Sequence, residues 1–303
     1  MCQVGKESCA FFAMTYSIPT DILSRPIAVI GSGTLGRRIA LMMSTQGGEV
    51  RLHDSAQHSL EQGLRFIEET LPAILPSIPN SRAAQVTGTS ELAAAVDGAW
   101  LVFESVPERL DLKIEIFAML DSISSSDAIL ASNSSSFPAS QFAARCKRPE
   151  RVLNTHFYMP PMIRAVELMG SSRTDPTIID LLMERFEAYG LIPFHVRNES
   201  VGFIFNRIWA AIKRESLSVV AEGVSDPGDV DRLFTLVAGV PLGPFRNMDA
   251  VGLDVVLDIE EHYASIRPEI PHGPRELLKS YLARGWAGRK TGRGFYNDYE
   301  TKD

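Results

Sequence analysis

The chain has 303 residues, of which 45% are hydrophobic and 22% are charged, a composition typical of a soluble globular protein with one large or two ordinary domains. Its formal net charge is −7 and it contains no run of basic residues, so we expect neither nucleic acid nor a membrane as a partner. The apolar stretches are also far shorter than the ~18 residues that a membrane span needs.

Cysteine and histidine usage argues against disulfides and metal sites. The three cysteines are Cys2, Cys9 and Cys146, an odd number that favours neither a disulfide framework nor a cysteine-based metal site. Residues 1–24 form a predicted N-terminal tail without the features of an organelle presequence or a secretion signal, so we expect a cytoplasmic protein. Apart from His156, the histidines lack the spacing that is typical of metal ligands. They are His53, His58, His195, His262 and His272.

Residues 26–54 predict a strand, a glycine-rich turn, a helix and a second strand, in that order. The apolar run 27–30 has the length and hydrophobicity of a buried strand. The pattern G-x-G-x-x-G follows it, and the amphipathic stretch 35–43 then predicts a helix. EVRLHD predicts the second strand, with Asp54 at its tip.

This turn has the chemistry of a dinucleotide-binding site. Its glycines permit a tight turn, the close approach of a pyrophosphate and the packing of the helix on the strand, while the helix N-terminus attracts phosphates. Asp54 can accept hydrogen bonds from a ribose diol and would repel a 2′-phosphate, so the sequence favours NAD over NADP. The alternative is a glycine turn in another α/β fold. The cofactor-binding residues predicted in this segment are Gly31, Gly33, Thr34, Leu35, Gly36 and Asp54.

Strands and helices continue to alternate as far as residue 196. The pattern predicts a parallel, doubly wound sheet of the Rossmann type. Because ligands lie beyond the carboxyl ends of such strands, Glu104, the 133–136 loop and His156 are predicted to form one site. Strands are predicted at 98–105, 128–136, 151–156, 163–168 and 191–196, and helices at 110–123 and 176–190.

Helical periodicity replaces this alternation after residue 200. We therefore predict an α/β protein, with an NAD-binding Rossmann-type domain at 25–199 followed by an all-helical C-terminal domain at 200–303. By analogy with other nucleotide-binding proteins, the helical domain is expected to form a homodimer. Helices are predicted there at 202–223, 229–239, 249–266 and 274–284.

The segment LNTHFYMPPMIRAVEL, residues 153–168, places His156 and Glu167 in two short β-like runs that are joined by a loop with two prolines. If the two runs are adjacent strands, the imidazole can act as a general base and the carboxylate can fix its tautomer. An imidazole with a pKa near ~6.5 suits proton removal from a secondary alcohol at neutral pH. The alternative is a pair of surface residues without a function.

Several segments between Pro26 and Tyr296 match a known family in the same order along the chain. They are GSGTLGRRIA, FESVPERLDLK, SNSSSF, THFYMPP with AVEL, VGFIFNRIW, VPLGPFRNMDAVGLD and GRKTGRGFY. Together they resemble the short-chain L-3-hydroxyacyl-CoA dehydrogenase family, including its lambda-crystallin/L-gulonate dehydrogenase branch. The resemblance implies a dehydrogenase that uses NAD.

The resemblance implies catalytic roles for four residues. His156 takes the place of the family's catalytic histidine, and Glu167 that of the acid that holds it. Ser135 corresponds to the active-site serine and Asn206 to the asparagine that completes the site. Such hydroxyl and amide donors can hold the substrate oxygen as its charge changes. The alternatives are a plain serine-rich turn at Ser135 and a polar residue at a helix start at Asn206.

The resemblance also completes the predicted cofactor-binding set. It implies that Glu108 and Lys113 lie near the nicotinamide ribose and that Asn133 lies beside the nicotinamide. For Lys113, a solvated position on a helix is the alternative.

Two departures from the family pattern concern the substrate. Met159 stands where the family usually has asparagine, and the spacing to Glu167 is one residue shorter. Family members that act on CoA esters carry lysines on the helical arm after the second strand, whereas residues 55–95 contain only Arg65 and Arg82 as basic groups. This lack of positive charge weighs against CoA but not against dehydrogenase chemistry.

Prolines interrupt the same helical arm. Pro72, Pro76 and Pro79 predict a shortened or bent segment, because proline inside a helix removes a donor and costs ~3 kcal/mol. An altered arm is a second argument against CoA.

Three functions follow from these observations. The leading hypothesis is NAD-dependent oxidation of a 3-hydroxyacyl-CoA, or a related thioester, to the 3-oxoacyl form, with His156 as the base. The alternative is an NAD-dependent dehydrogenase of a free hydroxy acid or a specialised metabolite, similar to gulonate dehydrogenase. The third is an NAD-binding protein without catalysis, similar to a crystallin. The first two imply a small-molecule substrate.

Overall fold

The computed structural model describes residues 16–300, and the chain divides into two compact units, Met1–Phe203 and Ile204–Asp303. The first unit contains the sheet and the second is all-helical. Among the described residues, no helix is long and apolar enough to cross a membrane.

Part of the predicted N-terminal tail is packed. Cys2 and Cys9 lie outside the described residues. Tyr16 and Ile18 pack against the core of the first unit, and the hydroxyl of Tyr16 donates a hydrogen bond of 2.8 Å to the carbonyl oxygen of Asp127. The residues just before the first strand are therefore anchored to the domain.

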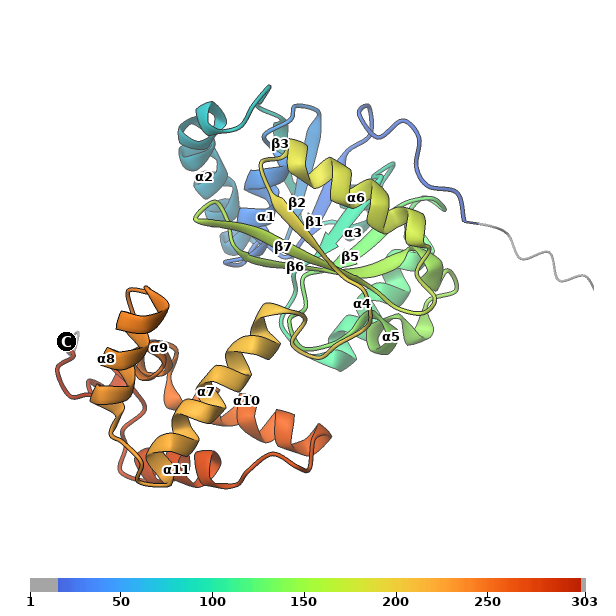
Figure 1. The fold of residues 1–303 in the computed structure, drawn as a ribbon. Helices are drawn as coiled ribbons and strands as arrows, with labels where there is room; N and C mark the ends of the chain where they lie inside the picture. Colours follow the sequence, from blue (N-terminus) through green and yellow to red (C-terminus); the bar gives the residue numbers. More distant parts are fainter. Residues whose placement is uncertain (1–15, 301–303) are drawn as a thin grey trace, which may run out of the picture. The chain divides into compact units, whose positions relative to one another are not determined.

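The first unit is built around an eight-stranded sheet (Figure 1). The strand order is β3-β2-β1-β4-β5-β6-β7-β8, and β1 to β6 run parallel. The first six strands have the order of a Rossmann-type sheet, which confirms the predicted fold class. The strands are β1 (Ile27–Ile30), β2 (Glu49–His53), β3 (Gln85–Thr89), β4 (Leu101–Glu104), β5 (Ile129–Ser132), β6 (Val152–Met159), β7 (Ile163–Gly170) and β8 (Ile192–Val196).

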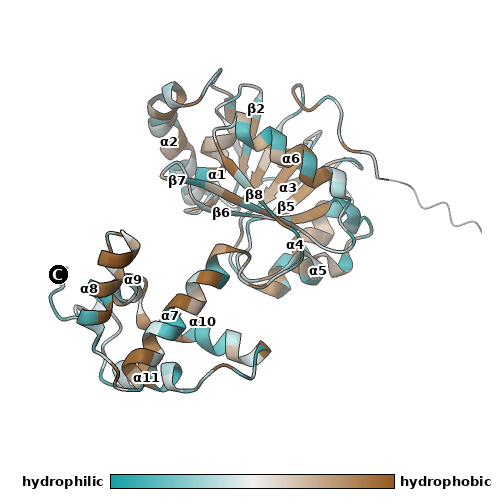
Figure 2. Ribbon diagram, viewed as in Figure 1, coloured by the Kyte–Doolittle hydropathy of each residue, from teal (hydrophilic) through white to brown (hydrophobic). Residues whose placement is uncertain are grey.

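Helices cover both faces of this sheet. Successive residues of β1 point to opposite faces, so Ile27 and Val29 pack with α1, α2 and α6, whereas Ala28 and Ile30 pack with α3, α4 and α5. The central strands β1, β4 and β5 are buried along their whole length, and the middle of the sheet is hydrophobic (Figure 2), as expected of strands covered on both faces. The helices are α1 (Gly36–Met43), α2 (Gln57–Ile74), α3 (Leu92–Val96), α4 (Leu110–Ile123), α5 (Ala139–Phe142) and α6 (Pro176–Ala188), with 3₁₀ turns at Leu75–Ser77, Ala143–Arg145 and Pro149–Arg151.

The parallel arrangement ends at β6, which corrects the prediction of a parallel sheet throughout. β7 runs antiparallel to β6, and β8 runs parallel to β7. The connection at 160–162 is far too short for a crossover, which needs a dozen or more residues, so the chain turns back directly. The resulting hairpin pairs His156 with Glu167.

The arm after β2 contains one long helix followed by a 3₁₀ turn. Helix α2 has 18 residues and includes Pro72, so proline does not interrupt the helix there. Pro72 lies in the last turn, and Pro76 falls in the 3₁₀ turn that follows, so the loss of backbone hydrogen bonds is confined to the end of the arm. Strand β3 was not predicted, because QVTGT is a partly exposed edge strand without an apolar run.

The second unit is all-helical, as predicted. Its core contains Leu217, Phe245 and Met248, among others. The predicted helix 249–266 is two helices, because Gly252 has a φ of 109° and ends the first of them. The helices are α7 (Phe205–Ala221), α8 (Pro227–Ala238), α9 (Pro244–Val251), α10 (Leu253–Ile266) and α11 (Gly273–Leu282), with a 3₁₀ turn at Arg289–Thr291.

A buried ion pair joins α4 to the start of β6. The guanidinium of Arg151 has an exposed fraction of 0% and donates to Oδ1 of Asp121 at 2.9 Å and to the carbonyl oxygens of Ser125 and Ala128. Burial disfavours the charged form of Asp121. Hydrogen bonds from Arg151 and from the backbone N–H of Lys147 outweigh burial and hold the pKa of Asp121 below its usual value.

Replacing Asp121 with alanine is expected to lower the free energy of unfolding by about 3–5 kcal/mol, because the buried guanidinium of Arg151 loses its partner. Urea denaturation followed by circular dichroism measures this loss. Asp111→Ala, on the same helix but in an exposed pair with Arg109, is the matched control and should leave the unfolding midpoint almost unchanged. Similar losses in both variants would show that the buried pair contributes no more to stability than the exposed one.

Candidate active site

A cavity of about 990 Å³ lies in the first unit, at the carboxyl ends of β1, β2, β4 and β5 and along the β6–β7 hairpin. Of the three features predicted to converge, the 133–136 loop and His156 line this cavity, whereas Glu104 is buried and is not part of the lining. Gly36, Lys113 and Glu167 are not part of the lining, and Asn206 belongs to the second unit. The predicted residues that line the cavity are Gly31, Gly33, Thr34, Leu35, Asp54, Glu108, Asn133, Ser135 and His156.

Each glycine of the first turn is needed for a different reason. Gly31 has a φ of 97°, and a Cβ there would lie 2.5 Å from the carbonyl oxygen of Ser105. A Cβ on Gly36 would overlap the carbonyl oxygen of Gly31, so α1 can pack on the strand only with glycine at this position. Gly33 instead faces open space at the cavity, since nothing lies within 4 Å of a Cβ built on it. A pyrophosphate can thus approach the backbone at the N-terminus of α1, and the turn fits NAD.

Asp54 presents an ionised carboxylate to the same cavity. Its Oδ2 accepts hydrogen bonds from the backbone N–H and the hydroxyl of Ser32, both at 2.8 Å, and its Oδ1 accepts one from the N–H of Ala56 at 2.9 Å. Burial disfavours the charge, but these hydrogen bonds outweigh it and hold the pKa of Asp54 below its usual value. A carboxylate has about four acceptor positions, so the second position of Oδ1 remains for a ribose hydroxyl.

His156 and Glu167 form a buried pair across the hairpin, as predicted. Nδ1 of His156 lies 3.0 Å from Oε2 of Glu167, and the two side chains are only 9% and 3% exposed. An ionised Glu167 favours the tautomer with hydrogen on Nδ1, which leaves the lone pair of Nε2 available to accept a proton. Because His156 also lines the cavity, the pair can act on a ligand bound there.

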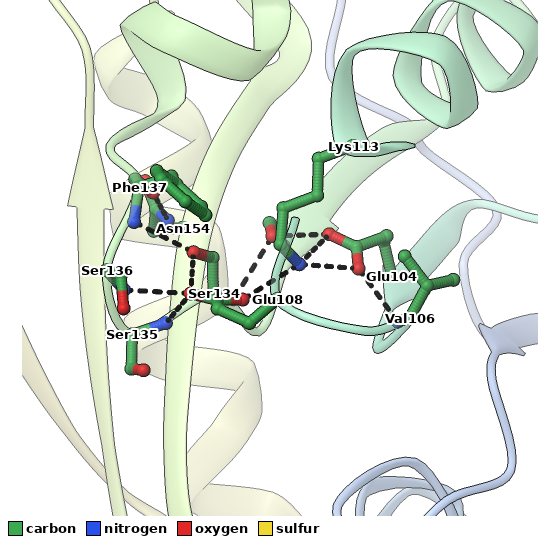
Figure 3. A network of polar contacts seen from close by, with 10 residues as sticks. Glu104, Val106, Glu108, Lys113, Ser134, Ser135, Ser136, Phe137 and Asn154 are labelled. Carbon is green, nitrogen blue, oxygen red and sulfur yellow. Dashed lines mark hydrogen bonds and ion pairs between the residues drawn. The ribbon is translucent and has the colours of Figure 1, made fainter. Parts of the chain in front are cut away.

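Lys113 is buried, which excludes the solvated alternative. Its side chain is 1% exposed, and it does not itself line the cavity. Its Nζ lies 2.8 Å from Oε1 of Glu104 and 3.1 Å from Oε2 of Glu108 (Figure 3). Since Glu108 lines the cavity, Lys113 supports the cavity wall from behind, and its place near a nicotinamide ribose stays a prediction.

Glu108 extends this network to the loop that follows β5 (Figure 3). Its Oε1 accepts hydrogen bonds from the hydroxyl of Ser134 at 2.6 Å and from the backbone N–H groups of Ser135 and Ser136 at 3.1 and 2.9 Å. Burial disfavours its charge, but the ammonium of Lys113 and the loop donors outweigh burial and hold the pKa of Glu108 below its usual value. The carboxylate therefore fixes the backbone on which Ser135 is carried.

Two residues of the same loop face the cavity. Of the three serines, Ser135 lines the cavity, whereas Ser134 is buried and binds Glu108, which favours the predicted assignment of Ser135 as the site residue. Oδ1 of Asn133 accepts a hydrogen bond of 3.0 Å from the backbone N–H of Phe157. Asn133 thereby attaches the loop to β6, next to the position of His156.

Tyr158 is also part of the site, although it was not among the predicted residues. Its hydroxyl donates to Oε2 of Glu167 at 2.8 Å, and its ring centroid lies 4.7 Å from that of His156. The spacing of two residues from His156 could have revealed it, because residues i and i+2 of a strand share a face. Asn206 is the second residue of α7 in the other unit, so its participation stays a prediction.

Replacing Asp54 with alanine is expected to weaken NAD binding about 10- to 100-fold, since hydrogen bonds to a charged group are lost. The preference for NAD over NADP should also narrow, because the charge that repels a 2′-phosphate is removed. Fluorescence titrations with NADH and NADPH measure both effects. Asp97→Ala, at an exposed position outside the cavity, is the control, and an unchanged NADH-to-NADPH affinity ratio in Asp54→Ala would refute the assignment.

Comparison with known proteins agrees with this geometry. Residues 26–200 match the model of the 3-hydroxyacyl-CoA dehydrogenase NAD binding domain, and residues 202–298 match that of the family's C-terminal domain. The chain is 34% identical over 290 residues to a probable 3-hydroxybutyryl-CoA dehydrogenase of Bacillus subtilis. The aligned region covers 92% of this chain and 98% of the relative. It is 30% identical over 280 residues to the 5-formyl-3-hydroxy-2-methylpyridine 4-carboxylate 5-dehydrogenase of Mesorhizobium japonicum, with 90% of each chain covered.

A solved structure extends this similarity to the fold. The crystal structure of (S)-3-hydroxybutyryl-CoA dehydrogenase from Ralstonia eutropha matches with a TM-score of 0.79 and 27% identity, covering 92% of this chain and 100% of that one. Both family domains are present, and the cofactor is NAD. The chain therefore belongs to the 3-hydroxyacyl-CoA dehydrogenase family.

Proposed function

We propose that the protein oxidises the 3-hydroxyl group of a 3-hydroxyacyl-CoA, or of a related thioester, to the 3-oxoacyl form with NAD, and that His156 is the base. One observation supports this most directly: His156, held by Glu167 at 3.0 Å, lines the same cavity as the glycine turn and Asp54. The choice of substrate rests on the relatives named 3-hydroxybutyryl-CoA dehydrogenase.

The proposed chemistry divides the work among a few side chains. Oxidation removes the hydroxyl proton and a hydride from the same alcohol, and NAD, when bound, supplies the hydride acceptor. Nε2 of His156 takes the proton, and Glu167 stabilises the imidazolium that forms. Ser135 and Asn206 hold the substrate oxygen while its charge changes. The ring of Phe203, 4.9 Å from the imidazole, excludes water from one side of the base.

A free hydroxy acid or a specialised metabolite is the second candidate substrate. The exposed face of α2 is acidic and would repel the phosphates of CoA. In addition, the Mesorhizobium japonicum relative is named for a pyridine carboxylate rather than for a CoA ester. The exposed acids of α2 are Glu61, Glu68 and Glu69.

Other charges near α2 support CoA as the leading candidate. The guanidinium groups of Arg37 and Arg38 on α1 lie 4.7 and 5.1 Å from the ring centre of Phe66 on α2. Positive charge therefore lies beside this arm on a neighbouring helix, outside residues 55–95. A non-catalytic, crystallin-like role is the third candidate, but it gives no use to the buried pair of His156 and Glu167, whose burial has a cost.

We expect the purified protein to form NADH from NAD and 3-hydroxybutyryl-CoA, measured by absorbance. His156→Ala should lower kcat about 10²- to 10⁴-fold, the usual contribution of a general base. NAD affinity should be retained, because His156 is not among the residues proposed to bind the dinucleotide. His195→Ala, an exposed histidine on β8, is the matched control and should keep full activity.

The same assay with free 3-hydroxybutyrate separates the three functions. A higher kcat/KM for the free acid would favour the second candidate. NAD binding without turnover across CoA esters and free hydroxy acids would favour the third. Unimpaired turnover by His156→Ala would remove the proposed base.

We further propose a cytoplasmic homodimer formed through the second unit. Leu233, Leu236 and Val237 on α8 are 64%, 73% and 80% exposed and border an apolar groove of about 810 Å³. Burying each such side chain contributes about 1.5–3 kcal/mol, so a second copy is a fitting cover for this face. Cys146, the cysteine in the described part of the chain, is buried as a free thiol, which is in keeping with a reducing compartment.

The double variant Leu236→Asp/Val237→Asp is expected to shift the protein from dimer to monomer, because a two-fold interface would bring the new charges together. Size-exclusion chromatography with light scattering measures the mass. Leu23→Asp, at a 75% exposed position of the first unit, is the control. A monomeric wild-type protein, or a dimer unaffected by the double variant, would rule out this interface.

A further inference from the structure

One oxygen of Glu167 has two donors. The hydroxyl of Tyr158 donates to Oε2 at 2.8 Å, and Nδ1 of His156 binds the same atom at 3.0 Å. Tyr158 lies on the same strand as His156, and the two ring centroids are 4.7 Å apart. Tyr158 and His156 also both line the cavity. The phenol is therefore connected to the proposed base directly by ring contact and indirectly through the carboxylate.

Two donors on one oxygen share its negative charge. A carboxylate that already accepts a hydrogen bond from a phenol stabilises the positive charge of an imidazolium less. Burial, together with the neighbouring Glu167 carboxylate, raises the pKa of Tyr158, so its hydroxyl stays protonated and remains a donor over the working pH range. The hydrogen bond from Tyr158 therefore acts on the same carboxylate oxygen that faces Nδ1 of His156.

We propose that Tyr158 is a positioning residue that, through Glu167, lowers the basicity of His156 and extends the pH range in which Nε2 is free to accept a proton. Tyr158 exchanges no proton with the substrate; its hydroxyl adjusts the carboxylate and its ring limits rotation of the imidazole. This inference rests on the proposed role of His156 as the base.

Other groups of the first unit also lie around the pair. Phe203 packs on the imidazole with ring centroids 4.9 Å apart, and Phe194 of β8 is the register partner of Glu167. Within the described residues of the first unit, the titratable groups that contact the imidazole are Glu167 and Tyr158. The remaining titratable groups of the cavity lining are His53, Asp54 and Glu108.

Of these three, the two carboxylates are already engaged. Asp54 accepts hydrogen bonds from Ser32 and Ala56 at the far end of the lining, next to the glycine turn. Glu108 is paired with Lys113 and with the loop after β5. His53 is the last residue of β2, and burial lowers its pKa, so it adds little positive charge to the cavity.

Tyr158→Phe in the full-length protein tests the inference, because it keeps the ring and removes only the hydroxyl. NMR titration gives the pKa of the His156 imidazole, assigned by comparison with His156→Ala, and the acidic limb of kcat/KM against pH gives the apparent value in turnover. Both are expected to rise by about 0.5 unit or more, the size expected from the loss of one hydrogen bond to a charged group. The sign follows because Glu167, with one donor fewer, stabilises the imidazolium more.

Tyr16→Phe is the matched control, since it removes a hydroxyl that also donates at 2.8 Å, to the carbonyl of Asp127, and Tyr16 is outside the cavity lining. It should change neither value. A Tyr158→Phe variant that loses activity equally at all pH values, with an unchanged imidazole pKa, would overturn the inference and leave only a packing role. If the wild-type protein turns over no substrate, the proposed function fails, but the NMR titration still decides whether Tyr158 acts on His156.

Discussion

The antiparallel pairing of β6 with β7 is the constraint on which the site depends. Neither His156 nor Glu167 can be placed by its own strand alone, because the contact exists only in the register that sets them opposite each other. Side chains alternate between the two faces of a strand, so a slip of one residue would separate the imidazole from its carboxylate. The apolar residues around the pair, including Phe157 and Val166, prevent such a slip because they must remain buried.

The second support of the site is electrostatic. Lys113 and Glu104 are completely enclosed, yet each charge has a partner, and Ser132 adds a hydrogen bond to the carboxylate. Such a pair adds little net stability, because desolvation offsets the attraction. What it provides is geometry: through Glu108 it holds the backbone after β5 in one conformation, so that Ser135 is already in place when a ligand enters the cavity.

Local patterns in the sequence predicted much of this arrangement. The first strand, turn and helix could be recognised because each glycine meets a local requirement of the turn. Helix 110–123 was predicted with its observed bounds. Strand β3 escaped prediction because an edge strand needs no apolar run. The direction of β7 depends on the short 160–162 connection, which alternation of strands and helices does not reveal.

Side-chain environments were harder to predict than elements. Whether Lys113 is solvated or buried depends on Glu104, a residue on another element, so spacing along its own helix could not decide. The same holds for Tyr158, whose role depends on an acid across the hairpin. By contrast, the contact of His156 with Glu167 was predictable, because two strands joined by a short loop usually pair as a hairpin.

The hairpin also contains a break in its own regularity. The pairing of β6 and β7 is irregular between Phe157 and Met159, just beyond His156, and the chain then continues to Ile163, which lines the cavity with Met159. Because of this irregularity, a residue can be added to or deleted from the 160–162 connection without a shift of His156 or Glu167. The loop at the entrance of the cavity can therefore change in length and polarity while His156 and Glu167 keep their positions. In this way, proteins with one fold can evolve to oxidise thioesters or free acids.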